Sequence, residues 1–255
     1  GTFLFGGRNN GEAPYNGYVD DVTIWRSALP QGNIMALAEG ASPIGVGGPG
    51  ASYSQNFDGF DDGTTDLEDG SVMTGAAASV QDGRLQLTID QQGLGFSSFS
   101  VPALPGSSQG FTASFDYELY DSPGANDPAD GFSFNYGDAP LGDQGQAEEG
   151  MATRPGVTEN ISWEVDTWRN GDAEQGVNIS GIAGGADLGQ LDFTNGIILE
   201  DDSRKTGTME ISWNPAVGAS FTTNGLTTNA DFSNVDTGAF VADDGHNFII
   251  SARVG

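Results

Sequence analysis

Apolar and polar residues alternate in short runs along most of this 255-residue chain, and clusters of Gly, Asp, Asn and Pro separate the runs. The run FTASFDYELY places its aromatic and aliphatic side chains on one face and its Thr, Ser, Asp and Glu side chains on the other. Alternation with a period of two is typical of a half-buried β-strand. Further runs of this kind are RLQLTI, DGFSFNYG, ISWEVDTW, GVNISGI, TMEISWN, ASFTTNG and NFIISARV. Their number predicts an all-β chain that forms a two-sheet antiparallel sandwich rather than a small barrel.

Three regions follow one another along the sequence. Residues 1–41 contain an apolar run (FLFGG), a strand (YVDDVTIW) and a short helix around NIMALAEG, which Gly40 is expected to end. Residues 42–52, SPIGVGGPGAS, have no apolar period and predict a linker or a long crossing loop. The series of strands occupies residues 53–255.

The formal net charge is −28, from 36 acidic and 8 basic residues. Such a negative surface repels nucleic acid and anionic membranes, so nucleic-acid binding is not expected. No apolar stretch reaches the roughly 20 residues that a membrane-spanning helix needs, so no membrane insertion is expected. Carboxylate-rich surfaces suit divalent cations, calcium in particular. An equally good interpretation is that the charge only keeps an extracellular protein in solution.

Two acidic residues, Glu164 and Asp166, lie on the same face of the strand ISWEVDTW. Their backbones stand about 7 Å apart, and two carboxylates this close repel each other unless a cation, an arginine or water lies between them. The residues that follow supply further oxygen ligands, from Asn170, Asp172 and the carbonyl groups of the loop. The pattern alone leaves open whether these acids cut a bond, hold an ion or only contact water.

The stretch EVDTWRNGDAEQGVNI resembles the metal-binding loop of the L-type (legume-like) lectins, in which Glu-x-Asp-x-aromatic-x-Asn precedes a polar loop and an alternating strand. The upstream stretch PADGFSFNYG resembles a second hallmark of these lectins, an Ala-Asp-Gly-Phe strand end. The distance between the two stretches is similar to that in the family. The resemblance implies a concanavalin A-like jelly-roll sandwich over about residues 53–255, without its last strand.

The resemblance also implies two overlapping sets of site residues. The set implied to contact the sugar is Asp130, Gly131, Trp168 and Asn170. The set implied to hold calcium is Asp166, Trp168 through its carbonyl, Asn170, Asp172 and, at most as an outer helper, Glu164. A hard cation holds carboxylate and amide groups in fixed orientations, so that these groups can accept hydrogen bonds from a polyol and donate hydrogen bonds to it.

The chain departs from the family pattern in two places. Asp172 follows only two residues after Asn170, whereas the family's loop runs longer before its second Asp. The family's metal-binding histidine would fall near Gln175, and the single histidine of this chain is His246, so a second metal site that uses Glu164 is doubtful. The alternative interpretations are a hydrated acidic loop whose Asn and Gly make turns, and an aspartate at position 130 that caps backbone amides.

The same sandwich also occurs in laminarinase-like glycosidases, whose strand reads Glu-x-Asp-x-x-Glu. In this chain Arg169 stands where the second catalytic Glu belongs. Retaining hydrolysis needs two carboxyl groups about 5–5.5 Å apart, and that pair is missing from the motif. A single histidine gives little support to a Ser-His-Asp set, and no Gly-rich phosphate loop follows a strand. The sequence therefore predicts a protein that is not an enzyme.

Residues 1–41 resemble the closing segment of laminin-G-like jelly-roll domains, through a GG turn, the strand GYVDDVTIW and a short helix. Joining NFIISARVG at the end to GTFLFGG at the start gives one continuous sandwich ending. We therefore expect one unit of a tandem array or a circular permutation, in which residues 1–41 complete their own sandwich or a neighbour's. An unpaired sandwich edge exposes backbone donors and favours such a strand. The alternative is the retained tail of a truncated laminin-G-like domain.

Two functions from different classes agree with these patterns. The first is an extracellular or cell-surface carbohydrate-binding module of a larger bacterial protein, with a glycan or polysaccharide as partner and calcium as cofactor. The second is a structural repeat of an adhesin or filament, which binds no sugar and associates head to tail with identical neighbouring subunits. The fold cannot decide between them, because function depends on the site.

Overall fold

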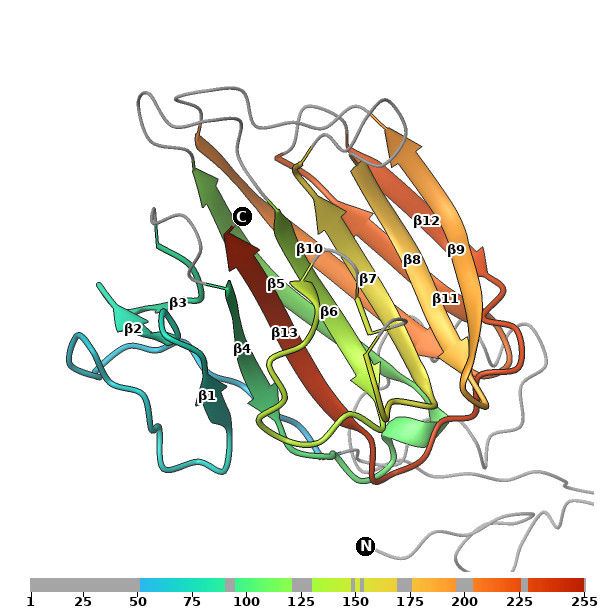
Figure 1. Cartoon of the computed structure of the whole chain (residues 1–255), viewed down its shortest axis with the longest axis horizontal. Helices are drawn as coiled ribbons and strands as arrows, with labels where there is room; N and C mark the ends of the chain where they lie inside the picture. Colours follow the sequence, from blue (N-terminus) through green and yellow to red (C-terminus); the bar gives the residue numbers. More distant parts are fainter. Residues whose placement is uncertain are drawn as a thin grey trace, which may run out of the picture.

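In this computed structural model the described residues form thirteen strands and one short 3-10 helix (Figure 1). The structure describes residues 51–89, 95–120, 130–147, 150–151, 154–168, 176–195, 204–225 and 229–254. The strands are β1 (Val72–Thr74), β2 (Ser79–Gln81), β3 (Arg84–Gln86), β4 (Gly95–Val101), β5 (Phe111–Tyr120), β6 (Gly131–Gly137), β7 (Asn160–Asp166), β8 (Gly176–Ala183), β9 (Ala186–Asn195), β10 (Arg204–Asn214), β11 (Gly218–Thr223), β12 (Ala230–Val235) and β13 (Asn247–Val254). The predicted helix around residues 33–40, the predicted strand at residues 18–25 and residues 42–50 of the predicted linker lie outside the described residues.

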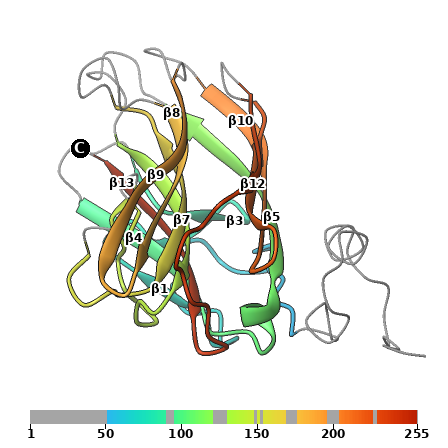
Figure 2. The same ribbon diagram turned by 90° about the vertical axis from the view of Figure 1, so that its right-hand side faces the viewer.

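Two antiparallel sheets contain most of these strands. The larger sheet has seven strands in the order β1-β4-β13-β6-β7-β8-β9, and the smaller has four in the order β12-β11-β10-β5. The strands β2 and β3 form a separate hairpin. Viewed from the side, the two sheets lie face to face as two layers (Figure 2). The predicted all-β, two-sheet antiparallel sandwich is therefore confirmed.

Large apolar side chains fill the space between the two sheets. On β7, Ile161, Trp163 and Val165 are fully buried in this core, as the alternation predicted. The ring of Phe111 on β5 links the two layers, because its centroid lies 4.8 Å from that of Tyr136 and 5.0 Å from that of Phe248. Burial of each such side chain stabilises the fold by about 1.5–3 kcal/mol.

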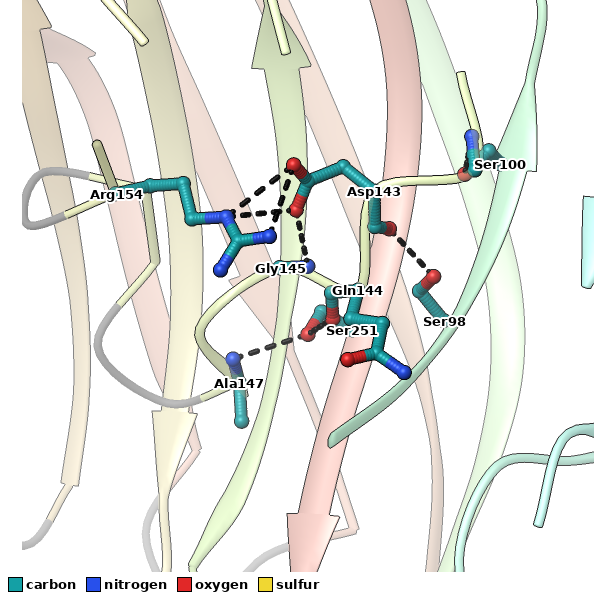
Figure 3. A network of polar contacts seen from close by, with 9 residues as sticks. Ser98, Ser100, Asp143, Gln144, Gly145, Ala147, Arg154 and Ser251 are labelled. Carbon is teal, nitrogen blue, oxygen red and sulfur yellow. Dashed lines mark hydrogen bonds and ion pairs between the residues drawn. The ribbon is translucent and has the colours of Figure 1, made fainter. Parts of the chain in front are cut away.

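The opposite face of the seven-stranded sheet is mostly polar and is also buried, and its apolar residues Ile182 and Ile249 pack in a second, small hydrophobic cluster. The buried polar residues on this face are Ser98, Ser100, Ser133, Asn135, Ser162, Glu164 and Ser251. They lie beneath the connection between β6 and β7, which we call the crossing segment (described residues 138–147, 150–151 and 154–159) (Figure 3). No pattern in the sequence predicted this cover.

Hydrogen bonds between main chain and serine hydroxyls attach the crossing segment to the sheet (Figure 3). Its amides donate from Gly142 to Ser100 (3.2 Å), from Ala147 to Ser251 (3.0 Å) and from Met151 to Ser162 (3.1 Å). An ion pair closes the segment on itself, with Arg154 Nε 2.9 Å from Asp143 Oδ1 and Arg154 Nη2 3.1 Å from Asp143 Oδ2. Because buried polar groups need partners, this ladder of bonds offsets the cost of covering a polar face.

Candidate functional site

The backbone of Asp130 joins three strands at one end of the seven-stranded sheet. Its amide donates to the carbonyl of Arg253 on β13 (3.2 Å), and its carbonyl accepts from the amide of Thr167, just beyond β7 (2.9 Å). In the same register Gly131, the first residue of β6, pairs with Asp166, the last residue of β7. Two stretches that are some 35 positions apart in sequence therefore meet at neighbouring strand ends, as the resemblance implied.

Gly131 makes this close approach possible. Its φ is +131°, in a region that side-chain-bearing residues rarely adopt. A Cβ atom at this position would overlap the carbonyl oxygen of Val165 and would lie 3.2 Å from the Cα of Asp166. The glycine of the Ala-Asp-Gly-Phe stretch is thus needed to bring β6 against β7. We infer that Gly131 thereby also positions Asp130 and Asp166.

The carboxylate of Asp130 is buried, with 5 % of the residue exposed. It accepts a charge-assisted hydrogen bond from Nε of Arg253. The guanidinium carbon of Arg253 also lies 5.1 Å from the centre of the Phe96 ring, within the range of a cation–π contact. The aspartate is therefore held by an arginine, which is a different arrangement from a turn aspartate that caps backbone amides.

Asp166 is the last residue of β7, directly before the loop that follows. One of its carboxylate oxygens, Oδ1, accepts from the amide of Trp168 (2.8 Å), in the pattern of an Asx turn. The residue is 6 % exposed, and Trp168 is partly buried. The turn changes the direction of the chain immediately after Asp166.

Glu164 lies deeper, beneath the crossing segment, and is 3 % exposed. Its Oε1 accepts from the hydroxyl of Ser180 on β8. A Cβ atom on Gly150 of the crossing segment would overlap this same carboxylate oxygen, so the main chain covers Glu164 directly. Asn178 pairs with Glu164 in the register of β7 and β8. Its Oδ1 is buried and has no hydrogen-bond partner within the described part of the chain.

Calcium takes six to eight oxygen ligands, which come from carboxylates, backbone and amide carbonyls and water. Along β7 and β8 the structure offers such oxygens on Asp166, Glu164 and Asn178. Within the described ranges, no group of three or more His, Cys, Asp or Glu side chains is close enough to hold a metal ion. Asn170 and Asp172 lie outside the described residues. The oxygen ligands among the described residues suit a hard cation, but they are too few to complete its coordination shell.

Sequence reasoning missed three members of this arrangement, namely Arg253, Ser180 and Asn178. Each enters through strand pairing: β13 brings Arg253 beside Gly131, and β8 brings the other two beside β7. The only available signal was that all three lie in runs predicted to be strands. A local pattern does not give the partner of a strand, so these residues could not be assigned to the site.

Comparisons with known proteins give structural matches only. No family model matches the sequence, and no curated protein matches it either. Among solved structures, basic winged bean lectin with Tn-antigen matches with a TM-score of 0.55 and 17 % identity over 81 % of this chain and 89 % of the lectin. Lectin UEA-II complexed with galactose matches with a TM-score of 0.54 and 15 % identity, over 80 % and 92 %.

A third structure, winged bean acidic lectin complexed with methyl-α-D-galactose, has a TM-score of 0.51 and 18 % identity, over 78 % of this chain and 88 % of the lectin. At such low identity the matches establish architecture and not ligand. All three are lectins by name, which agrees with the expectation that this chain is not an enzyme. Together with the two-sheet topology, they show that the chain has the L-type lectin, concanavalin A-like fold.

Proposed function

We propose that this chain is a carbohydrate-binding, lectin-like module of a larger extracellular bacterial protein, and that calcium assists the binding. The observation that supports the proposal most strongly is the meeting of Asp130 with the end of β7. The Asp130 carbonyl accepts from the Thr167 amide (2.9 Å), so the two stretches that resemble lectin motifs occupy adjacent strand ends. The partner would be a glycan or polysaccharide.

In this proposal each residue has a separate task. Asp130 accepts hydrogen bonds from sugar hydroxyls, Asn170 donates and accepts beside it, and the Trp168 ring covers an apolar face of the pyranose. Gly131 sets the distance between the two strand ends. Arg253 holds the Asp130 carboxylate in one orientation, which reduces the side-chain entropy lost when the sugar binds.

Calcium would be held by Asp166, the Trp168 carbonyl, Asn170 and Asp172, with Glu164 and Asn178 behind them. When bound, the cation would supply a fixed positive charge that orients the carboxylate and amide groups facing the sugar. The support for this comes from the buried Oδ1 of Asn178, which lacks a partner among the described residues, and from the acidic residues on the same face of β7.

A glycan array tests the proposal, read with about 1 mM calcium and with a chelator in excess. Galactosides are the first probes, because two of the similar lectin structures are complexes with galactose or its methyl glycoside. We expect calcium-dependent binding by the wild type and by Asp231→Asn, a control on the exposed face of β12. We expect no binding by Asp130→Ala or Asp130→Asn with an unchanged circular dichroism spectrum.

The ion pair of Asp130 with Arg253 favours a second candidate function. A carboxylate that already has an arginine partner is less available to sugar hydroxyls, and such an arrangement is expected in a structural repeat that binds no sugar. Absence of binding to every glycan, with end-to-end association of the wild-type chain, would support this alternative. If Asp130→Ala binds sugar as tightly as the wild type, the proposed site is wrong. The chain would then still be a lectin, with its site elsewhere.

A further inference from the structure

The candidate site lies at one end of a row of residues that crosses the seven-stranded sheet. Neighbouring strands contribute four members of this row, which are in register with one another: Phe96 (β4), Arg253 (β13), Gly131 (β6) and Asp166 (β7). Because adjacent strands lie about 4.8 Å apart, the backbone of Phe96 stands roughly 10 Å from that of Gly131. The row therefore extends beyond the residues to which contacts with a single sugar are assigned above.

The crossing segment covers the neighbouring row more completely than this one. Ser98 and Ser251 lie two positions from Phe96 and Arg253 on the same strands, and so on the same face of the sheet. The hydroxyls of both serines donate to carbonyls of the crossing segment, at 2.6 and 2.7 Å (Figure 3). Both serines are fully buried, whereas Phe96 is partly buried and the side chain of Arg253 is 28 % exposed. Phe96 and Arg253 thus lie where the cover over this face decreases.

Phe96 is an aromatic residue on a polar face. The other residues of β4 on this face are Ser98 and Ser100. Phe96 belongs to neither of the two hydrophobic clusters that the described residues form. The contact that its ring makes is with Arg253, whose guanidinium carbon lies 5.1 Å from the ring centre. Packing of the core therefore gives no reason for an aromatic ring at this position.

Arg253 connects this ring with the candidate site. Its Nε donates to the carboxylate of Asp130, and its guanidinium group lies over Phe96. The charges of Arg253 and Asp130 offset each other, and Asp166 adds a negative charge to the same row. Because the whole chain carries a net charge of −28, this arrangement repels anionic sugars and favours neutral ones.

We propose that Phe96 forms a second aromatic subsite, and that the chain binds a neutral oligosaccharide that runs along this row from Asp130 to Phe96. The inference rests on the proposed function and specifies its ligand. One sugar unit contacts Asp130 and Trp168, and a later unit of the same oligosaccharide covers the ring of Phe96 with its apolar face. Because the two units are covalently linked, the second contact is intramolecular and increases the affinity for the oligosaccharide.

Calorimetric titration of the full chain tests this proposal with monosaccharides and trisaccharides, in about 1 mM calcium. The probes are galactose with galactotriose and mannose with mannotriose. We expect one trisaccharide to bind at least about tenfold more tightly than its monosaccharide. Equal affinity for a monosaccharide and its trisaccharide would overturn the second subsite and leave the proposed function intact. Absence of binding by all four probes would overturn both.

Substitutions at position 96 identify the ring that makes the second contact. Phe96→Leu keeps an apolar side chain beside Arg253 and removes the aromatic face. It should reduce the ratio of trisaccharide to monosaccharide affinity about two- to tenfold, whereas Phe96→Trp should preserve the ratio. Leu141→Ala is the control, because it removes an exposed apolar side chain from the crossing segment and should not change the ratio. If Phe96→Leu proves unstable, Phe96→Met replaces it.

The opposite outcome has an equally clear meaning. If Phe96→Leu weakens the binding of monosaccharide and trisaccharide by the same factor, Phe96 acts only by holding Arg253 against Asp130, and the second subsite is wrong. The charge of the ligand is tested at about 20 mM salt, where screening is weak. Galactotriose should bind more tightly than trigalacturonate, and tighter binding of trigalacturonate would overturn the assignment of a neutral ligand.

Discussion

Gly131→Ala is the substitution with the most specific structural consequence. The new Cβ would overlap the carbonyl oxygen of Val165 and would stand 3.0 Å from its carbonyl carbon. Neither atom can move without shifting the β6–β7 pair, because both belong to the main chain of a buried strand. The substitution also forces alanine to adopt φ near +131°. It therefore combines backbone strain with a steric clash at the border of the candidate site.

The two contributions can be estimated separately. Strain at a positive φ costs about 1–3 kcal/mol for a residue with a side chain. Separating the strand ends also weakens the hydrogen bond from Thr167 to Asp130 and one or two ladder bonds, each about 0.5–1.5 kcal/mol. We expect a total loss of about 3–4 kcal/mol, or a decrease in Tm of roughly 6–16 °C for a chain of this length.

Gly156→Ala is the matched control. Gly156 has φ of +90°, is exposed, and would have no atom within 4 Å of an added Cβ. This variant should be destabilised by the backbone strain alone, about 1–3 kcal/mol. Chemical denaturation followed by tryptophan fluorescence measures both variants against the wild type. Equal destabilisation by the two substitutions would refute the inference that Gly131 is required for the close approach of β6 and β7.

Two further predictions concern groups outside the candidate site. Burial lowers the pKa of His246 below its usual value, against the opposing effect of Asp138, Asp243 and Glu159. The unfolded chain then binds the proton more readily than the folded chain. The contribution of His246 to stability is therefore fully present above about pH 6.5 and decreases as the pH falls, by at most about 1.4 kcal/mol per pH unit. Urea unfolding at several pH values should show this loss in the wild type and not in His246→Gln. Arg154→Gln removes the ion pair with Asp143, which stabilises the crossing segment by about 1 kcal/mol after allowance for its exposure. Amide exchange in the crossing segment should therefore become about fivefold faster, while exchange in β10 is unaffected. An unchanged exchange rate would show that the hydrogen bonds to serine hydroxyls are sufficient to hold the segment.

Strands with strong contrast between their two faces were predictable from the sequence. β5, β6 and β7 each carry apolar or aromatic residues at every second position, and all three were predicted. β4 reads GFSSFSV and was missed, because Ser97 points inward and Ser98 outward, so the contrast is weak. β9 and β12 were missed as well, because the pairing of each contains a register shift that breaks the period of two.

The candidate site was predictable only as far as local motifs extend. Asp130 and Asp166 were chosen from two short stretches, and the structure brings these stretches together through the pairing of β6 with β7. The arginine that contacts Asp130 comes from β13, 123 positions later in the chain. The burial of Glu164 depends on the crossing segment, whose amides donate to serine hydroxyls and whose buried apolar residues are irregularly spaced. Such contacts leave no periodic signal in a sequence.

Calcium titration calorimetry tests the central claim, that Asp130 and the loop after β7 form one cation-dependent site. The measurement compares the wild type with Asp166→Asn and with Asp231→Asn, at about 150 mM salt so that diffuse binding to the acidic surface is screened. We predict one calcium ion per wild-type chain and per Asp231→Asn chain, and none for Asp166→Asn. The same stoichiometry and affinity in all three proteins would contradict the account.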